Sequence, residues 1–258
     1  MSREDGIYWD CQCPVFNGCE RHGPACDRCW AIGFAWRFGW NRSEKLQRRF
    51  GPLVEYNDSG EVEREYDWTG ATTFDRSPLL KLARVKAGKV VAFSWYGDWM
   101  HKQSIENIRI VLDEIQIIEQ HDFLTLTKRP ENLLNSLRGW YPIKHLWLGV
   151  TAWDQESYNN ACKYLSELPG WHTWISLEPM LSPVDITQSD FRPDFLVVGA
   201  ETGRGAREID PAKILTVHRQ CRTWDVPCWV KHIPDNNGYK YDLSAYRQSP
   251  FAQGETNA

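Results

Sequence analysis

Short apolar runs alternate with amphipathic segments along the chain from about residue 88 onward. The run 90–95 is almost continuously apolar and predicts a buried strand, while the segment 104–119 carries apolar residues at helical spacing. The same order of strand and then helix recurs toward the C-terminus. The remaining predicted strands are 123–127, 145–150, 171–177, 194–199 and 227–231. The remaining predicted helices are 130–137, 155–168 and 211–224.

This alternation predicts an α/β fold, in which parallel strands are joined by right-handed helical crossovers. The strands are continuous apolar runs, as expected when both faces of a sheet are covered. A further strand near residues 7–11 brings the total to about seven. We therefore expect a (β/α) barrel, and a partial one of six to seven parallel strands fits best. An open doubly wound sheet is the alternative, because hydrophobic periodicity does not separate the two.

One segment, at about residues 39–78, interrupts the pattern. It contains a charged stretch and a turn sequence at 57–60, which predicts a small hairpin leading into residues 61–68. We interpret the segment as an insertion or lid on a single α/β domain that spans residues 1–233. Residues 234–258 are polar and rich in Gly, Asn and Ser, so we expect a loosely ordered C-terminal tail.

Composition indicates the cellular compartment and the kinds of partner to expect. The 258 residues include 30 Lys and Arg against 34 Asp and Glu, and the formal net charge of -4 gives no global attraction to nucleic acid. The sequence shows no secretion signal and no stretch long and apolar enough to span a membrane, so we expect a cytoplasmic protein. Eight cysteines in that setting favour reduced thiols and metal binding over disulfides.

Three of those cysteines, Cys19, Cys26 and Cys29, form a C-x6-C-x2-C pattern on a loop bent by Gly and Pro. Three thiolates can converge on a metal and leave its coordination shell incomplete, whereas a structural zinc takes four protein ligands. The spacing therefore favours a reactive metal centre over a structural clip. His22, within the same loop, is either a fourth ligand or a solvated residue.

Polar residues follow the ends of several predicted strands. In a (β/α) barrel the chemistry gathers at the carboxyl ends of the strands, and the cysteine loop, which follows the first predicted strand, belongs to the same edge. We therefore expect a polar ring beside the three thiols. Its members are Asp98, Lys128, Arg129, Thr151, Glu178, Glu201 and Lys231.

These motifs resemble those of a largely uncharacterised, phage-associated family of three-Cys-motif proteins. The segment from Gly18 to Ala31 is similar to that family's G-C-x6-C-x2-C-[aromatic]-A signature. The resemblance keeps its order from residue 7 to about residue 232, which is nearly the whole chain. The other matching segments are LTKRP at 126–130, WLGVT at 147–151, SLEPML at 176–181, VGAETG at 198–203 with Arg207, and Val230-Lys231.

The family is similar to radical S-adenosylmethionine enzymes, which implies a partial (β/α) barrel of their type. The resemblance also implies a [4Fe–4S] cluster bound by Cys19, Cys26 and Cys29, with S-adenosylmethionine on the open iron and cleaved to a 5′-deoxyadenosyl radical. The chain departs from the commonest spacing, C-x3-C-x2-C, by a first gap of six residues. Arg28 stands where that motif has an aromatic residue, and an extra thiol, Cys13, stands in the family's W-N-P position.

Under this hypothesis the protein is an iron–sulfur enzyme, and the polar residues divide into three roles. The expected catalytic residues are Glu178, Glu201 and Lys128. The expected S-adenosylmethionine-binding residues are Trp30, Asp98, Thr151 and Glu201. The expected substrate-binding residues are Arg129, Arg207 and Lys231. The resemblance further implies a phage or bacterial-host cytoplasm, a protein reductant, and a nucleotide or nucleic acid as the modified substrate.

Two other functions fit the same residues. A zinc-binding module for nucleic acid or protein would use Cys11 or Cys13 as a fourth thiolate ligand. A metal-independent barrel hydrolase would use Glu178 and Glu201 as paired carboxylates for acid–base catalysis. Neither explains a three-thiolate loop on a barrel rim as directly as an iron–sulfur enzyme does.

Overall fold

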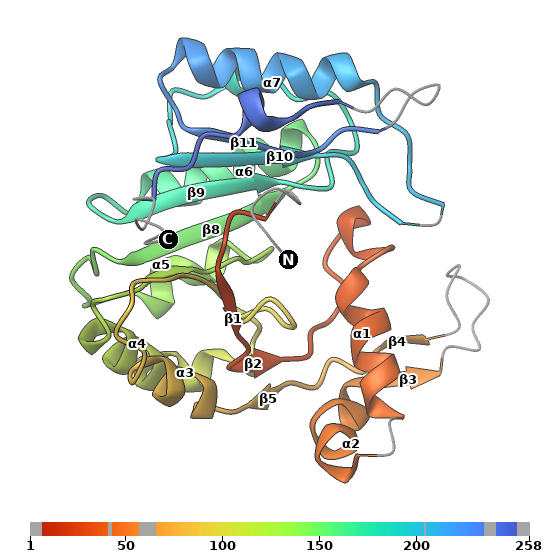
Figure 1. The fold of residues 1–258 in the computed structure, drawn as a ribbon, viewed down its shortest axis with the longest axis vertical. Coiled ribbons are helices and arrows are strands. Elements are labelled where there is room, and N and C mark those ends of the chain that lie inside the picture. The colour runs from red at the N-terminus through yellow and green to blue at the C-terminus, as the bar shows by residue number, and fades with distance from the viewer. Residues whose placement is uncertain (1–6, 41–42, 57–65, 204, 235–240, 252–258) are drawn as a thin grey trace.

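A parallel sheet of seven strands forms the body of the protein (Figure 1). The computed structural model describes residues 7–40, 43–56, 66–203, 205–234 and 241–251. The spatial order of the strands is β1-β6-β7-β8-β9-β10-β11, and each neighbouring pair is parallel. Their bounds are β1 (Cys11–Cys13), β6 (Val90–Phe93), β7 (Asp122–Leu124), β8 (Leu146–Ala152), β9 (His172–Leu177), β10 (Phe195–Gly199) and β11 (Cys228–His232).

The sheet curls through 207° into a half-barrel, with helices alternating with the strands along the chain. The prediction of an α/β fold with a partial (β/α) barrel is therefore confirmed, and the open doubly wound sheet is not what forms. Helix α6 packs against β8 and β9, and α7 packs against β10 and β11. The helices that precede or connect these strands are α3 (Ser77–Leu82), α4 (Ile108–Ile117), α5 (Glu131–Ser136), α6 (Gln155–Ser166) and α7 (Pro211–Thr223).

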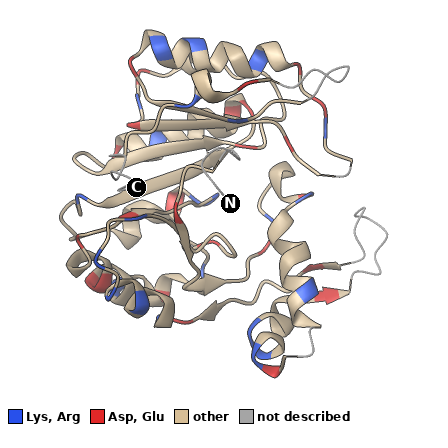
Figure 2. Cartoon of the chain, viewed as in Figure 1, with Lys and Arg blue, Asp and Glu red and all other residues tan. Residues whose placement is uncertain are grey.

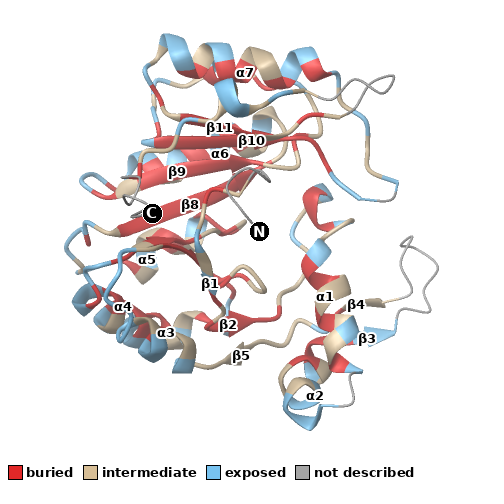
Figure 3. Ribbon diagram, viewed as in Figure 1, coloured by how far each residue is buried: buried red, intermediate tan, exposed pale blue. Residues whose placement is uncertain are grey.

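The two sides of the curled sheet are filled by different kinds of side chain. The convex side packs mainly aliphatic residues against the helices, whereas the cluster on the concave side is mainly aromatic. Gly149 makes room for that cluster, because a Cβ atom there would lie 2.3 Å from the ring of Trp174. Figure 3 shows β8, β9 and β10 buried along most of their length. The largest members of the concave cluster are Tyr8, Trp147, Trp174, Phe195, Trp229 and Phe251.

The strands and helices predicted after residue 88 all lie close to observed elements. The first strand lies later than expected. The sequence predicts it near residues 7–11, whereas β1 forms at Cys11–Cys13. The residues before it still follow β6. The amide of Asp10 donates to the carbonyl of Val90 (2.7 Å), and the Asp10 carboxylate accepts from the amide of Val90 (2.8 Å). The Asp10 side chain thus takes the place of a backbone carbonyl in the hydrogen-bond ladder between β1 and β6. Strand β1 therefore begins later than the apolar residues of the sequence indicate.

The segment predicted as an insertion folds onto a helix that leaves the cysteine loop, and together they form the insertion unit. The unit comprises α1 (Trp30–Gly39), α2 (Glu44–Phe50) and the antiparallel pair β3 (Val54–Tyr56) and β4 (Tyr66–Trp68). The predicted hairpin is thus present, although its turn at 57–60 lies outside the described residues. A second small pair, β2 (Phe16–Asn17) and β5 (Thr73–Phe74), joins the unit to the half-barrel. The unit's core residues are Ala31, Ile32, Ala35, Phe50, Leu53, Val54 and Trp68.

The C-terminal segment between residues 241 and 251 packs along the edge strand β11. The amide of Gln248 donates to the carbonyl of Cys228 (2.8 Å), and Arg247 Nε donates to the carbonyl of Val230 (3.3 Å). Phe251 is buried in the concave aromatic cluster. The segment 241–251 thus contacts an edge strand and both core clusters, and the loose order of the whole tail stays a prediction.

Charged side chains lie mainly on the helices and loops, while the strands carry few of them (Figure 2). None of the helices among the described residues is long and apolar enough to cross a membrane. Several of the loop charges, including Asp98, Lys128 and Arg129, follow strand ends and lie beside the cysteine loop.

Candidate metal centre

The cysteine loop begins where β2 ends. Gly18 precedes Cys19 and has a φ of +89°, a left-handed conformation that favours glycine. A Cβ atom at this position would lie 2.2 Å from the carbonyl oxygen of Ala71, so the close backbone approach also excludes a side chain. The amide of Gly18 donates to the carbonyl of Tyr96 (3.1 Å), beyond the end of β6. Backbone contacts therefore fix the start of the loop at the carboxyl edge of the sheet.

Cys26 and Cys29 lie on consecutive turns that lead into α1. Cys26 ends a short 3-10 helix (Pro24–Cys26), and its amide donates to the carbonyl of Gly23 (2.8 Å). Cys29 is the N-cap residue of α1, and its amide donates to the carbonyl of Cys26 (3.1 Å). The N-terminal end of a helix carries partial positive charge, so this position suits an anionic centre.

All three cysteines line one cavity of about 120 Å³, which we call the cysteine cavity. Within the described part of the chain, no three His, Cys, Asp or Glu side chains lie close enough together to hold one metal ion. The thiols thus surround a space rather than meet at a point. The other principal residues of the cavity wall are Trp30, Trp68, Trp95, Asp98, Lys128 and Thr151.

Arg129 supports Cys19 from behind the cavity wall. Its guanidinium donates to Cys19 Sγ (3.6 Å), to Asp98 Oδ2 (2.9 Å) and to the carbonyl of Glu20 (3.1 Å). The Asp98 carboxylate also accepts from the hydroxyl of Thr127 (2.6 Å), so this buried acid is well satisfied. Burial raises the pKa of the Cys19 thiol to about 12, with a contribution from Asp98, while the charge of Arg129 acts to lower it. Arg129 is therefore a positioning residue for the Cys19 sulfur.

Lys128, which follows β7, places an ammonium group beside the three thiols. Its Nζ atom makes no hydrogen bond or ion pair with another described residue. Burial acts to lower the pKa of Lys128, but the negative charges of Cys26 and Cys29, with Asp98 and Cys19, outweigh burial and raise it. The side chain is therefore a fixed positive charge that balances thiolates in the cavity.

A second group of ion pairs, which we call the Arg207 latch, ties the loop after β10 to the cysteine loop. Glu201 accepts hydrogen bonds from the amide and the Nε of Arg207, both at 2.9 Å. Arg207 also donates to the carbonyl of Pro24 (3.0 Å) and to the carboxylate of Asp27 (3.4 Å). Burial acts to raise the pKa of Glu201, but the hydrogen bonds and charge of Arg207, together with Arg28, lower it. The latch thus keeps Glu201 ionised and the loop in place.

Glu178 and Lys231 form a separate ion pair at the ends of β9 and β11. Lys231 Nζ lies 2.8 Å from Glu178 Oε1, and it also lies 5.9 Å from the ring centroid of Trp9. Neither charged residue lines the cysteine cavity. The pair belongs to the mouth of the aromatic-filled interior rather than to the thiols.

A family model described as "Protein of unknown function (DUF5131)" matches residues 7–250. The chain belongs to this family. No curated protein and no solved structure matches the chain. The cysteine loop, all seven strands and the Arg207 latch of this DUF5131 protein lie inside the matched region.

The structure brings some of the residues predicted from sequence together and keeps others apart. Those that line the cysteine cavity are Cys19, Cys26, Cys29, Trp30, Asp98, Lys128 and Thr151. Arg129 lies behind the wall, whereas Glu201 and Arg207 pair in the latch and Glu178 and Lys231 pair with each other. The Thr151 hydroxyl is buried without a hydrogen-bond partner among the described residues.

The rival metal ligands lie elsewhere in this DUF5131 protein. Cys13 is fully buried in the core between β1 and the helices, and neither Cys11 nor Cys13 lines the cysteine cavity. His22 faces an adjoining groove of about 680 Å³, which shares Lys128 and Thr151 with the cavity. Burial lowers the pKa of His22, with Arg129 adding to the effect, so a neutral ring is favoured there.

Two wall residues, Trp68 and Trp95, were not predicted as part of the site. Trp95 ends the run 90–95, so its place at the carboxyl edge was open to prediction from the strand pattern. Trp68 comes from β4 of the inserted hairpin and carries no comparable sequence signal. Its position depends on tertiary packing, including an ion pair between Arg21 of the cysteine loop and Asp67.

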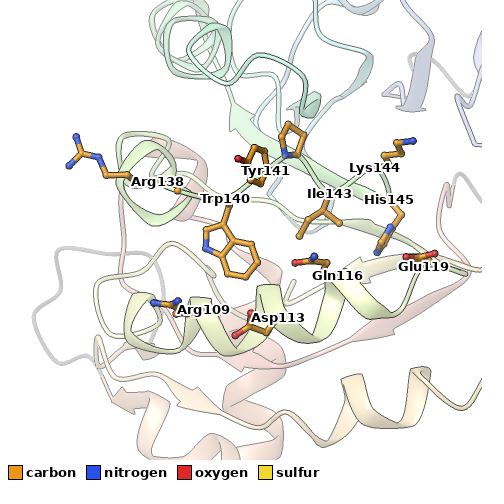
Figure 4. Close-up of a pocket in the computed structure, with 12 residues that line it drawn as sticks. Arg109, Asp113, Gln116, Glu119, Arg138, Trp140, Tyr141, Ile143, Lys144 and His145 are labelled. Atoms are coloured by element: carbon orange, nitrogen blue, oxygen red, sulfur yellow. The ribbon is translucent and has the colours of Figure 1, made fainter.

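A much larger hollow lies away from the thiols, between α4 and the segment 138–145 (Figure 4). We call it the α4 groove, and its volume is about 890 Å³. Its lining mixes charged residues such as Arg109, Asp113 and Arg138 with the aromatic Trp140 and Tyr141. No cysteine and no residue predicted for the site lines it. Size alone therefore does not single out the functional site.

Proposed function

We propose that this protein is a radical S-adenosylmethionine-type iron–sulfur enzyme. The observation that carries the proposal is the cysteine cavity, in which three cysteine side chains and the ammonium group of Lys128 share one space. The cavity lies at the carboxyl ends of the strands of a partial (β/α) barrel, where barrel enzymes carry their active sites. The family match by itself assigns no activity.

The donor set fits a [4Fe–4S] cluster held by Cys19, Cys26 and Cys29. In such a cluster each thiolate binds a different iron, so the sulfurs need not converge as they must on a single zinc, where Zn–S bonds are about 2.3 Å. Three protein ligands leave one iron open. When bound, the cluster and S-adenosylmethionine supply the one-electron chemistry that yields a 5′-deoxyadenosyl radical.

The chain's own residues prepare the cavity for that chemistry. Lys128 balances the negative charge of the thiolates, and the ion pair of Arg129 with Asp98 holds the Cys19 side of the loop. The rings of Trp30, Trp68 and Trp95 line the space and limit the access of water. The unpartnered hydroxyl of Thr151 is a donor for a bound cofactor or substrate.

Contacts around the alternative residues do not favour the other two functions. A four-thiolate zinc site would need Cys11 or Cys13, which lie outside the cavity. A paired-carboxylate hydrolase would need free acids, whereas Glu178 and Glu201 are each held by a cation. A protein reductant and a nucleotide or nucleic-acid substrate complete the proposal, on the strength of the family resemblance.

Anaerobic purification followed by iron and sulfide reconstitution tests the proposal. We expect about four irons and four sulfides per chain, with visible absorption typical of a cluster. Cys26→Ala should abolish iron uptake, while Cys11→Ala, which removes a thiol outside the cavity, should leave it unchanged. One tightly bound zinc per chain with no iron uptake would contradict the proposal.

A further inference from the structure

One face of α1 carries three tryptophans and an arginine. Trp30, Gly33, Trp36, Arg37 and Trp40 recur at steps of three and four residues, which places them on one side of the helix axis. The opposite side packs into the core of the insertion unit through small and aliphatic residues. Trp30 is 55% exposed and Trp40 is 70% exposed, so this face is directed to solvent.

Two tyrosines of the β3–β4 hairpin extend the same face. The ring of Tyr66 stacks on Trp36, with the ring centroids 5.0 Å apart and the planes 8° apart. The centroids of Trp40 and Tyr56 lie 5.4 Å and 6.5 Å from that of Trp36. Tyr56 is 58% exposed. We call Trp30, Trp36, Trp40, Tyr56 and Tyr66 the aromatic stripe.

The stripe concentrates most of the exposed aromatic surface of the protein. Among the described residues four aromatic side chains are strongly exposed, and three of them, Trp30, Trp40 and Tyr56, belong to the stripe. The fourth is Tyr141 of the α4 groove. A contiguous exposed apolar patch marks a surface that contacts a ligand or another macromolecule.

The stripe leads to the cysteine cavity. Trp30 directly follows Cys29 and lines the cavity, while Trp40 lies just past the other end of α1. Figure 1 shows α1 running from the edge of the half-barrel toward α2. A helix of this length spans about 15 Å, which matches about four stacked nucleotides at ~3.4 Å each. A strand bound along the stripe would therefore reach the cavity.

Charge on the insertion unit is mixed rather than strongly basic. Arg37 is exposed within the face, but Arg48 of α2 pairs with Glu44 at 3.1 Å, and Glu55 of β3 is exposed. The sequence of residues 57–65 adds four acidic residues against one basic residue. Duplex binding depends on neutralising many phosphates, which this charge pattern does not favour. Ring faces suit unpaired bases, which stack on aromatic side chains whatever their sequence.

We propose that the aromatic stripe binds single-stranded nucleic acid by base stacking and leads the strand toward the cysteine cavity. Arg37 adds a contact to a phosphate or to a base face. The binding step needs no metal and stands apart from the proposed function. Only the delivery of a nucleotide to the cavity rests on that function, and there it defines the substrate as a nucleotide within a single strand.

Fluorescence anisotropy with labelled ten-nucleotide single strands, of DNA and of RNA, tests the proposal on the full chain before and after iron reconstitution. We expect at least one of the two strands to bind and the matching duplex to bind more weakly. Trp40→Ala should weaken binding about tenfold, because one stacked base is lost. Trp40→Phe, which keeps a ring, should retain most of the affinity. The dependence on salt should be shallow, as expected when stacking outweighs phosphate contacts.

Tyr141→Ala is the matched control, because it removes another strongly exposed aromatic ring, which lies in the α4 groove and outside the stripe, and it should leave binding unchanged. Absence of single-strand binding at about 100 μM protein, the weak end of non-specific affinity, would overturn the proposal. Equal losses from Trp40→Ala and Tyr141→Ala would overturn it too. So would a dimer in light scattering that Trp40→Ala converts to a monomer, since a second copy would then occupy the stripe. Strand binding that persists while iron uptake fails would contradict the proposed function alone.

Discussion

The cysteine cavity and the α4 groove differ in size and in chemistry, and the smaller one is the better candidate for function. The groove is about seven times larger, at about 890 Å³ against about 120 Å³. Its charged residues, such as Arg109 and Asp113, form no ion pair with each other or with other described residues. Beside the cavity, by contrast, a buried ion pair joins Arg129 to Asp98, and Arg129 also lies 3.6 Å from the partly exposed Glu20.

The difference in ion pairing between the two hollows indicates which of them is a candidate functional site. Burying charge is unfavourable unless partners compensate it, so a cluster of compensated charges around three cysteine side chains is not explained by stability alone. An open groove lined by solvated side chains needs no such explanation, because its charges remain in contact with water. Removing a charged residue at the cysteine cavity should therefore change stability or metal binding more than removing one at the α4 groove.

Removal of the Arg129 charge should have the largest effect on stability. Arg129→Met leaves Asp98 buried without its cation, and the free energy of unfolding should fall by about 3–5 kcal/mol. Urea denaturation of the metal-free protein measures this loss. The exposed arginine of the groove is the control, since Arg138→Met should change the free energy by no more than about 0.5 kcal/mol. Similar losses in the two variants would remove the distinction between the hollows.

Lys128→Met should act on the bound metal more than on the fold. Without the ammonium group, no cation remains among the described residues of the cavity wall, although Arg129 still contacts Cys19 from behind it. Metal affinity should therefore fall about 10- to 100-fold, as for other residues beside metal ligands. Chelator competition against the reconstituted protein reports this change. Lys144→Met removes an ammonium group from the groove and should leave iron retention as in the parent protein. Unchanged retention in Lys128→Met would show that Lys128 does not serve the metal centre.

The reactivity of Cys19 should continue to rise at high pH. Its pKa is raised to about 12, so in the metal-free protein the thiolate fraction grows about tenfold for each pH unit across the range 7–10. Alkylation by iodoacetamide, followed by peptide mass spectrometry, gives the rate for this residue. Arg129→Met should slow the labelling, because Arg129 acts to lower the pKa. A rate that levels off below pH 9 would contradict the buried position of Cys19.

The Arg207 latch should contribute the smallest of these effects, because it is partly exposed. Arg207→Gln should lower the free energy of unfolding by about 1 kcal/mol at neutral pH. The pKa of Glu201 is lowered in the folded protein, so the latch stabilises above the unfolded value of about 4.3 and loses its effect as pH falls through the folded value. Unfolding of both proteins between pH 7 and pH 3 should therefore show a difference that shrinks toward pH 3. A difference independent of pH would mean that Arg207 acts through packing rather than through Glu201.

The regular half of the fold could be predicted from sequence because its strands are continuous apolar runs. The predicted strand 171–177 and the observed β9 at His172–Leu177 nearly coincide for this reason. Helix α1 escaped prediction, since it starts inside the cysteine motif and its aromatic residues lie on the exposed side as well as the buried one. Its polar side is therefore hard to recognise in the sequence.

The candidate site could be predicted in its thiols and strand-end residues but not in its pairings. Strand ends place Asp98, Lys128 and Thr151 at one edge, so their meeting follows from topology. That Arg207 would bind Glu201 and the cysteine loop depends on the conformation of an irregular loop, which local sequence does not determine. Trp68 reaches the wall only because the hairpin packs on α1.

Low-temperature electron paramagnetic resonance of the reduced, reconstituted protein tests the central claim most directly. A cluster held by only Cys19, Cys26 and Cys29 has one iron without a protein thiolate, and the addition of S-adenosylmethionine should shift its signal. A cluster signal that S-adenosylmethionine leaves unchanged would mean that no iron is open to it. That result would contradict the assignment of the cysteine cavity as a radical S-adenosylmethionine centre.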